Sequence, residues 1–125
     1  MLTFRKLALA AAVAAVAIVA APFAASAAEE PAAFKQCRAC HSPEAGKNGV
    51  GPSLFGAYGR KIGQAPNYKY SPAHLSHADQ TIDEAFLTKY LANPKEVIPG
   101  NKMIFAGLKN PADVTAVIAY LKSLK

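Results

Sequence analysis

Two segments in the second half of the chain have the spacing of hydrophobic residues that is typical of amphipathic helices. The first begins at Thr81-Ile82-Asp83-Glu84, which has the pattern of a capping box, and ends at Asn93-Pro94. Its apolar positions fall on one helical face, at Phe86, Leu87, Tyr90 and Leu91. The second begins at Asn110-Pro111, and its apolar stripe is Val114, Val117, Ile118, Leu121 and Leu124. We therefore predict a helix in each segment.

The preceding part of the chain predicts one further helix followed by long loops. Glu29 and Glu30 before Pro31 suit a first helical turn, and this helix would run into a pair of cysteines. From residue 42 to residue 78 the chain is dense in Gly, Pro, Asn and Ser, which is typical of loops. So long a loop is unusual in a compact domain unless it wraps around something. No segment alternates with the period of a strand, so we predict a small all-α domain of three main helices.

The first residues of the chain have the anatomy of a secretory signal peptide. Arg5 and Lys6 precede an unbroken apolar run from Leu7 to Ala21, and Ala25-Ser26-Ala27 offers the small residues that a signal peptidase requires. We expect residues 1–27 to be removed, with cleavage one residue later as an alternative. A second alternative is that the leader stays uncleaved and anchors the protein to the membrane.

Removal of the leader would leave residues 28–125 as one domain in the periplasm. The formal net charge of the whole chain is +6, and loss of the two leader cations lowers it to about +4. Basic residues are few and are not interleaved with aromatic ones, so nucleic acid is not an expected partner. No later apolar run reaches about 18 residues, which excludes a protein with several membrane spans.

The chemistry of the chain is concentrated in Cys37-Arg38-Ala39-Cys40-His41. A disulfide between cysteines so close in sequence would constrain little of the unfolded chain. The C-x-x-C-H spacing is instead that of a covalent c-type haem, in which two thiols bind the vinyl groups and His41 lies beneath the iron. A thioredoxin-type pair would need a βαβ context, which is absent. A zinc site would need two further ligands, and only His74 and His77 remain.

The haem iron needs a sixth ligand or an open position. Met103 is the only methionine after the leader, and it lies in a loop bounded by Pro and Gly, far along the chain from His41. A thioether opposite an imidazole stabilises ferrous iron and raises the potential. His74 and His77 are the competing ligands, but their polar surroundings predict that both lie on the surface. We therefore predict His41 and Met103 as the two iron ligands.

The sequence resembles class I cytochrome c, and in particular the bacterial members that are most similar to the mitochondrial protein. The resemblance extends from about Phe34 to Lys125. Besides the cysteine motif, it is carried by residues 49–54 (GVGPSL), 58–60 (YGR), 70–71 (YS), 90–94 (YLANP) and 99–107 (PGNKMIFAG).

The resemblance implies roles for several further residues. The Pro52 carbonyl would accept a hydrogen bond from the proximal imidazole of His41, which orients the ring. Arg60, aided by Tyr70, would neutralise a buried haem propionate, and Tyr90 would pack near the methionine sulfur. Asn101 stands where the family has a threonine and can still donate or accept a hydrogen bond. Ile82 stands where the family has a tryptophan and offers no side-chain donor.

These residues predict a one-electron carrier and not an enzyme, monomeric and holding one haem c covalently through Cys37 and Cys40. The expected partners are redox proteins with acidic docking surfaces: a terminal oxidase, a quinol-oxidising complex, a reaction centre or a dehydrogenase. The alternatives are a catalytic or ligand-sensing haem protein with a weakly held sixth ligand, and a thiol–disulfide oxidoreductase. The residues expected to pack around the haem are Leu54, Phe55, Phe86, Leu87, Leu91, Ile104, Phe105 and Leu121. Those expected to form a basic ring at the haem edge are Lys35, Arg38, Lys47, Lys95, Lys102 and Lys109.

Overall fold

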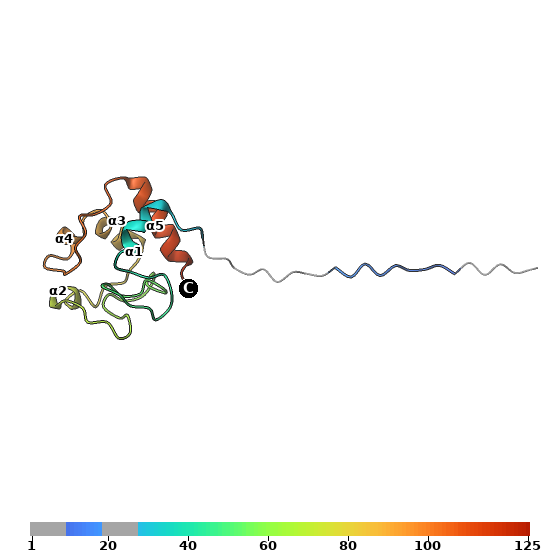
Figure 1. Ribbon diagram of the computed structural model, residues 1–125, viewed down its shortest axis with the longest axis horizontal. Coiled ribbons are helices and arrows are strands. Elements are labelled where there is room, and N and C mark those ends of the chain that lie inside the picture. Colours follow the sequence, from blue (N-terminus) through green and yellow to red (C-terminus); the bar gives the residue numbers. More distant parts are fainter. Residues whose placement is uncertain (1–9, 19–27) are drawn as a thin grey trace, which may run out of the picture.

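The computed structural model describes residues 10–18 and 28–125 (Figure 1). The basic pair of the leader and its expected cleavage site at residues 25–27 lie outside the described residues. Residues 10–18 form no regular secondary structure, and Val13, Val16 and Ile18 are exposed. In the described ranges no helix has the length and hydrophobicity needed to cross a membrane.

The predicted helix before the cysteine pair is confirmed, and it is short. Pro31 precedes a 3₁₀ turn, η1 (Ala32–Phe34), which continues directly into α1 (Lys35–Arg38). The amides of Cys40 and His41 both donate to the Cys37 carbonyl, at 3.1 and 2.8 Å. This last turn keeps Cys37, Cys40 and His41 close together in space.

Helix α3 (Glu84–Tyr90) begins later than the sequence pattern predicts. The N-cap is Asp83, whose carboxylate accepts the Phe86 amide at 2.8 Å, so the predicted capping box at Thr81 is wrong. Thr81 instead pairs with Lys61 in an isolated antiparallel bridge, which holds it in an extended conformation. The chain after α3 does not simply stop, because a short helix, α4 (Pro94–Val97), begins at Pro94.

Helix α5 (Pro111–Ser123) confirms the predicted start at Asn110-Pro111. The Asn110 side chain accepts the Ala112 amide at 3.0 Å, and Pro111 occupies the first turn. The loop between α1 and α3 contains one unpredicted short helix, α2 (Pro72–Leu75), which Ser71 caps by accepting the His74 amide at 3.1 Å. The described chain therefore contains two longer helices, α3 and α5, and several single turns.

The core forms where η1, α3 and α5 pack together. Phe34 is fully buried, and its ring meets that of Tyr120 edge to face, with 4.8 Å between centroids. Figure 1 shows α1, α3 and α5 close together, with α4 beside α3 and α2 farther off among the loops. The helices supply most of the core, and the loops add buried residues such as Ile98 and Leu108.

Most of the residues expected around the haem are buried or half-buried, and two are not. Leu87, Leu91 and Leu121 are buried; Leu54, Phe86 and Phe105 are half-buried. Phe55 is 37% exposed and does not line the cavity described below, so the prediction is wrong for Phe55; Ile104 is 96% exposed but lines that cavity. Ile104 lies in an irregular loop whose side chains alternate between inside and outside, and Met103 and Phe105 take the inner positions.

Candidate cofactor site

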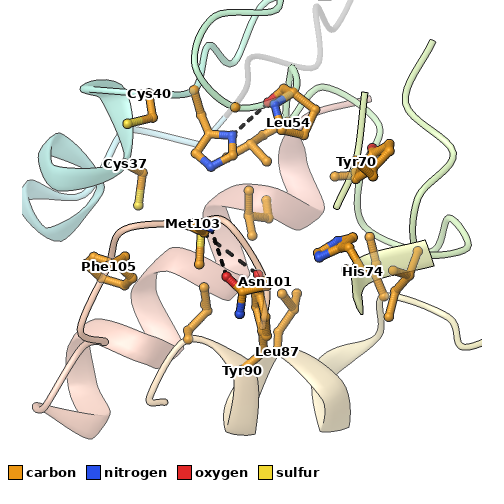
Figure 2. A pocket seen from close by; sticks show the side chains of 18 of the residues that line it. Cys37, Cys40, Leu54, Tyr70, His74, Leu87, Tyr90, Asn101, Met103 and Phe105 are labelled. Carbon is orange, nitrogen blue, oxygen red and sulfur yellow. Dashed lines mark hydrogen bonds between the residues drawn. The ribbon is translucent and has the colours of Figure 1, made fainter. Parts of the chain in front are cut away.

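A cavity of about 460 Å³ separates the helical core from the loops. Its wall is mostly apolar, and all nine predicted site residues line it: Cys37, Cys40, His41, Pro52, Arg60, Tyr70, Tyr90, Asn101 and Met103. Figure 2 shows the two cysteines at one side of the cavity, Tyr70 at the other and Met103 between them. The fold thus brings together residues that are far apart in the sequence, such as Cys37 and Met103.

The two cysteines are free, half-buried thiols at the end of α1. Burial raises the pKa of Cys37 to about 11, and the nearby Cys40 and Glu30 act in the same direction. A thiol with so high a pKa stays protonated at neutral pH, whereas a thiol–disulfide oxidoreductase needs a lowered cysteine pKa. Within the described residues, no group of three His, Cys, Asp or Glu side chains is placed to hold a metal ion.

His41 is fixed by a single hydrogen bond and by close contact with a glycine. Its Nδ1 lies 2.7 Å from the Pro52 carbonyl, so Nδ1 carries the proton and donates it. Burial lowers the pKa of His41, an effect opposed by the bond to Pro52, and the neutral ring therefore keeps its lone pair on Nε2. A Cβ on Gly51 would lie 2.4 Å from His41 Cε1, so only glycine fits beside this ring.

The loop that carries Met103 is organised by Asn101, a buried side chain with three hydrogen bonds. Its amide group donates to the carbonyls of Pro94 and Ile98 at 3.0 and 2.8 Å. Its oxygen accepts the Met103 amide at 2.9 Å (Figure 2). The Tyr90 hydroxyl lies 3.9 Å from the Met103 sulfur, within the reach of a weak hydrogen bond. Burial raises the pKa of Tyr90 to about 12, so this hydroxyl keeps its proton at neutral pH.

The polar end of the cavity has donors that lack an acceptor. Arg60 Nε is buried and has no hydrogen-bond partner within the described residues. The Tyr70 oxygen accepts the Ala65 amide at 3.0 Å, and this leaves the hydroxyl proton available for donation. A buried, unpaired guanidinium N–H is costly unless an acceptor reaches it. A haem, which has an apolar ring and two carboxylates, fits the apolar wall and these donors.

His74 also lines the cavity, so the prediction that it lies on the surface is wrong. Its ring stacks on Tyr70, with 5.1 Å between centroids, and it points into the cavity in Figure 2. The Ser71-Pro72 pair, typical of a helix start, was the sequence signal that could have placed this residue on an ordered turn. His77 lines no part of the cavity and interacts with Gln80 through its Nδ1, at 3.1 Å.

Comparisons with known proteins agree with this geometry. The family model for cytochrome c matches residues 27–125. Cytochrome c2 iso-1 of Magnetospirillum molischianum is 76% identical over 97 residues, which cover 76% of this chain and 96% of that protein. Cytochrome c2 of Rhodoplanes tepidamans is 69% identical, with 78% and 99% covered. The structure of cytochrome cH from Methylobacterium extorquens superposes with a TM-score of 0.67 at 46% identity, over 72% of this chain and 90% of that one.

Family, fold and site agree, and the competing assignments as a zinc protein or a dithiol oxidoreductase have no support in the geometry of the described residues. Electron carriers of this family exchange electrons with other redox proteins, and the relatives named above imply such partners here. The chain belongs to the cytochrome c family and is a class I electron carrier with one c-type haem held covalently by Cys37 and Cys40.

Proposed function

We propose that this protein is a periplasmic one-electron shuttle in which His41 and Met103 are the axial ligands of the haem iron. The observation that carries the proposal is that both side chains reach one cavity, which the two attachment cysteines also line. The haem supplies a one-electron couple. The surrounding chain fixes the ligands, excludes water and sets the charge around that couple.

On the proximal side, the chain presents His41 in one tautomer and one orientation. The bond from Nδ1 to the Pro52 carbonyl directs the lone pair of Nε2 away from the backbone. It also makes the imidazole a stronger electron donor, as partners of metal-bound histidines usually do. Gly51 keeps the backbone against the ring, which limits its rotation.

On the distal side, the chain holds a soft sulfur ligand and shields it from water. Asn101 fixes the backbone at Met103, so the sulfur can remain in place in both oxidation states. The Tyr90 hydroxyl, which donates toward this sulfur, reduces its electron density and so favours the ferrous state further. A methionine held in this way can stay bound during electron transfer. This favours an electron carrier over a catalytic haem protein, which needs an open position at the iron.

Arg60 and Tyr70 are the residues we propose to meet the haem carboxylates. Both provide donors in the cavity wall, and the buried Arg60 Nε lacks any other acceptor. An arginine charge buried beside a carboxylate keeps that carboxylate ionised. The cavity wall contains no aspartate or glutamate to compete for these donors.

We also propose where the protein works and with which proteins it exchanges electrons. The sequence pattern of residues 1–27 supports export and cleavage, so that residues 28–125 form the mature domain. The expected partners are a quinol-oxidising complex, a terminal oxidase, a reaction centre or a periplasmic dehydrogenase. A deletion strain assayed for each of these electron fluxes would show which one depends on the protein, and no loss in any of them would contradict the proposal.

The ligand assignment is tested by Met103→Ala, with Ile104→Ala as the matched control. Both variants shorten a side chain in the same loop, but Ile104 is 96% exposed. Because axial ligands can move haem potentials over roughly 0.8 V, we expect Met103→Ala to lower the potential by about 0.1 V or more. It should also abolish the sulfur-to-iron absorption band. Ile104→Ala, which shortens another side chain of the cavity wall and leaves the sulfur in place, should keep the band and change the potential much less. A Met103→Ala protein that keeps its band and its potential would refute the assignment.

A further inference from the structure

His74 is a titratable side chain that the proposed electron transfer does not use. It lies on α2, where Pro72 and the Ser71 cap fix the backbone, and its ring is enclosed by two tyrosines. The Tyr70 ring stacks on it at an interplanar angle of 14°, and the Tyr90 ring meets it edge to face at 6.3 Å between centroids. The position of the ring inside the cavity wall is therefore well defined.

The His74 ring makes no hydrogen bond to another side chain or backbone group within residues 28–125, whereas its backbone amide donates to the Ser71 hydroxyl. Burial, the larger cause, and the neighbouring His77 both lower the pKa of His74. The cavity wall adds the fixed cations Arg60 and Lys102, and it contains no carboxylate side chain. Burial and His77 disfavour the protonated imidazole, whereas the stacked Tyr70 ring and a haem carboxylate held by Arg60 and Tyr70 favour it, so its charge state depends on small changes of potential in the cavity.

We propose that His74 is a proton-binding site in the cavity wall whose occupancy is coupled to the oxidation state of the haem. The inference rests on the proposed function, because the haem that fills this cavity changes its charge by one unit in each turnover. When an electron arrives from a donor protein, the imidazole of His74 takes one proton from water. When the electron leaves, the same N–H bond breaks and the proton returns to water.

The direction of this coupling follows from the charges of the two oxidation states. The oxidised centre carries one more positive charge than the reduced centre and therefore repels a proton on His74 more strongly. The pKa of His74 is thus lower in the oxidised protein and higher in the reduced one. Across a cavity of this size, one unit charge changes a proton affinity several-fold even at an effective dielectric constant of about 20. The midpoint potential must then fall as the pH rises between the two pKa values.

The haem carboxylates, which the proposed function places at Arg60 and Tyr70, are ionisable groups near His74, and the His74→Asn variant separates their effect from that of the imidazole. The other groups that face His74 are phenols and cations. Burial raises the pKa of Tyr90 to about 12 and also raises the pKa of Tyr70, so both phenols remain neutral. Tyr68, which contacts the Tyr70 ring, is a phenol of the same kind. Arg60 and Lys102 are the basic side chains that line the same cavity. His77, three residues along the same segment, lies outside the cavity and provides the matched control.

The test is the midpoint potential of the intact holoprotein between about pH 4.5 and 8, a range that includes the ordinary histidine pKa of about 6.5. We expect the proton affinity of His74 to rise at least threefold on reduction. At 59 mV for each factor of ten, the potential then falls by about 28 mV or more across the range. His74→Asn should remove this fall, and the matched control His77→Asn should keep it. A fall of unchanged size in His74→Asn would overturn the proposal.

Proton NMR of the wild-type holoprotein gives an independent result, even if the variant folds poorly. The imidazole C–H resonances of His74 and His77 are followed against pH in both oxidation states. We expect the pKa of His74 to differ between the states and that of His77 to change much less. Equal His74 values, or no His74 titration, would overturn the proposal. The sulfur-to-iron band of the same samples reports separately whether Met103 binds the iron. Failure of the ligand assignment can therefore be distinguished from failure of the His74 proposal.

Discussion

Asn101 illustrates how much of the site depends on single side chains placed in irregular backbone. One buried amide satisfies two carbonyls and one N–H, and the loop on either side of Met103 has no other regular hydrogen bonding. Helical or strand periodicity cannot reveal such a residue, because the loop has neither period. It was identified through the resemblance to a family, and the structure explains its place in physical terms.

Gly51 is the residue with the sharpest steric requirement. A Cβ at this position would lie 2.4 Å from His41 Cε1 and 2.7 Å from Nδ1, so Gly51→Ala must push the ring away from the Pro52 carbonyl. We expect a loss of stability of about 1–3 kcal/mol from overpacking, together with a changed proximal ligand field. The measurements are thermal unfolding and the hyperfine-shifted NMR spectrum of the oxidised protein.

Gly56→Ala is the control for this substitution. Gly56 has a φ of +71° and nothing within 4 Å of its Cβ position, so alanine there adds backbone strain without a clash. A strained alanine costs about 1 kcal/mol but should leave the ligand spectrum unchanged. If both glycine variants shift the ligand spectrum equally, contact with His41 is not the reason for Gly51.

At the scale of elements, the start of a helix was predicted correctly where local capping residues determine it. It was predicted wrongly where a tertiary contact determines it. Asn110-Pro111 carries its own cap and starts α5 as predicted. Thr81 has equally good capping chemistry, but its bridge with Lys61 and the bond from the Ile82 amide to the Arg60 carbonyl keep it extended. The competing partner is distant in sequence, so no local pattern could have revealed it.

The Asn110 cap predicts a measurable loss of stability. Asn110→Ala removes the acceptor of the Ala112 amide, and loss of such a cap costs about 1 kcal/mol. In a domain of this size, that corresponds to a fall in Tm of about 4–8 °C. Asn110→Ser, which keeps a capping oxygen, should retain most of the stability in the same calorimetric measurement. An unchanged Tm in Asn110→Ala would show that α5 depends on packing alone.

At the scale of the whole molecule, the structure changes the expected ring of six basic residues. Arg38 pairs with Glu30 at 2.6 Å, and Lys47 pairs with Glu44 at 2.9 Å, which reduces the positive potential at both places. Lys102 donates to the Lys69 carbonyl and lies over the Tyr68 ring, so it also holds the loop. In the described chain, Lys35 and Lys95 have no such partner.

These contacts decide which charge reversals test docking. We expect Lys35→Glu to slow the reaction with an acidic redox partner markedly at low salt, because steering by charge raises association rates by about 10–10³-fold. Lys125→Glu, at the chain end, is the control; Lys122 is unsuitable because it pairs with Glu84 at 2.9 Å. The wild-type rate should fall as salt rises. Equal effects of both reversals, or a rate independent of salt, would exclude docking at Lys35.

The proposed processing makes a prediction about the purified protein. We expect the mature chain to begin at Ala28 or Glu29 and to carry the mass of one haem that survives acid–acetone extraction. Intact-protein mass spectrometry measures both. An uncleaved chain would favour the anchored alternative, and release of the haem by acid would contradict covalent attachment.

The cavity of about 460 Å³ has a consequence for how the protein is made. Without the haem ring, the mostly apolar wall of this cavity would face water, and the chain would lose the burial that the ring provides, a large loss for a small domain whose stability is only about 5–15 kcal/mol. The chain before haem attachment is therefore expected to be unfolded, with Cys37 and Cys40 open to the attachment machinery. We therefore expect the chain to resist proteolysis only after it has received its haem.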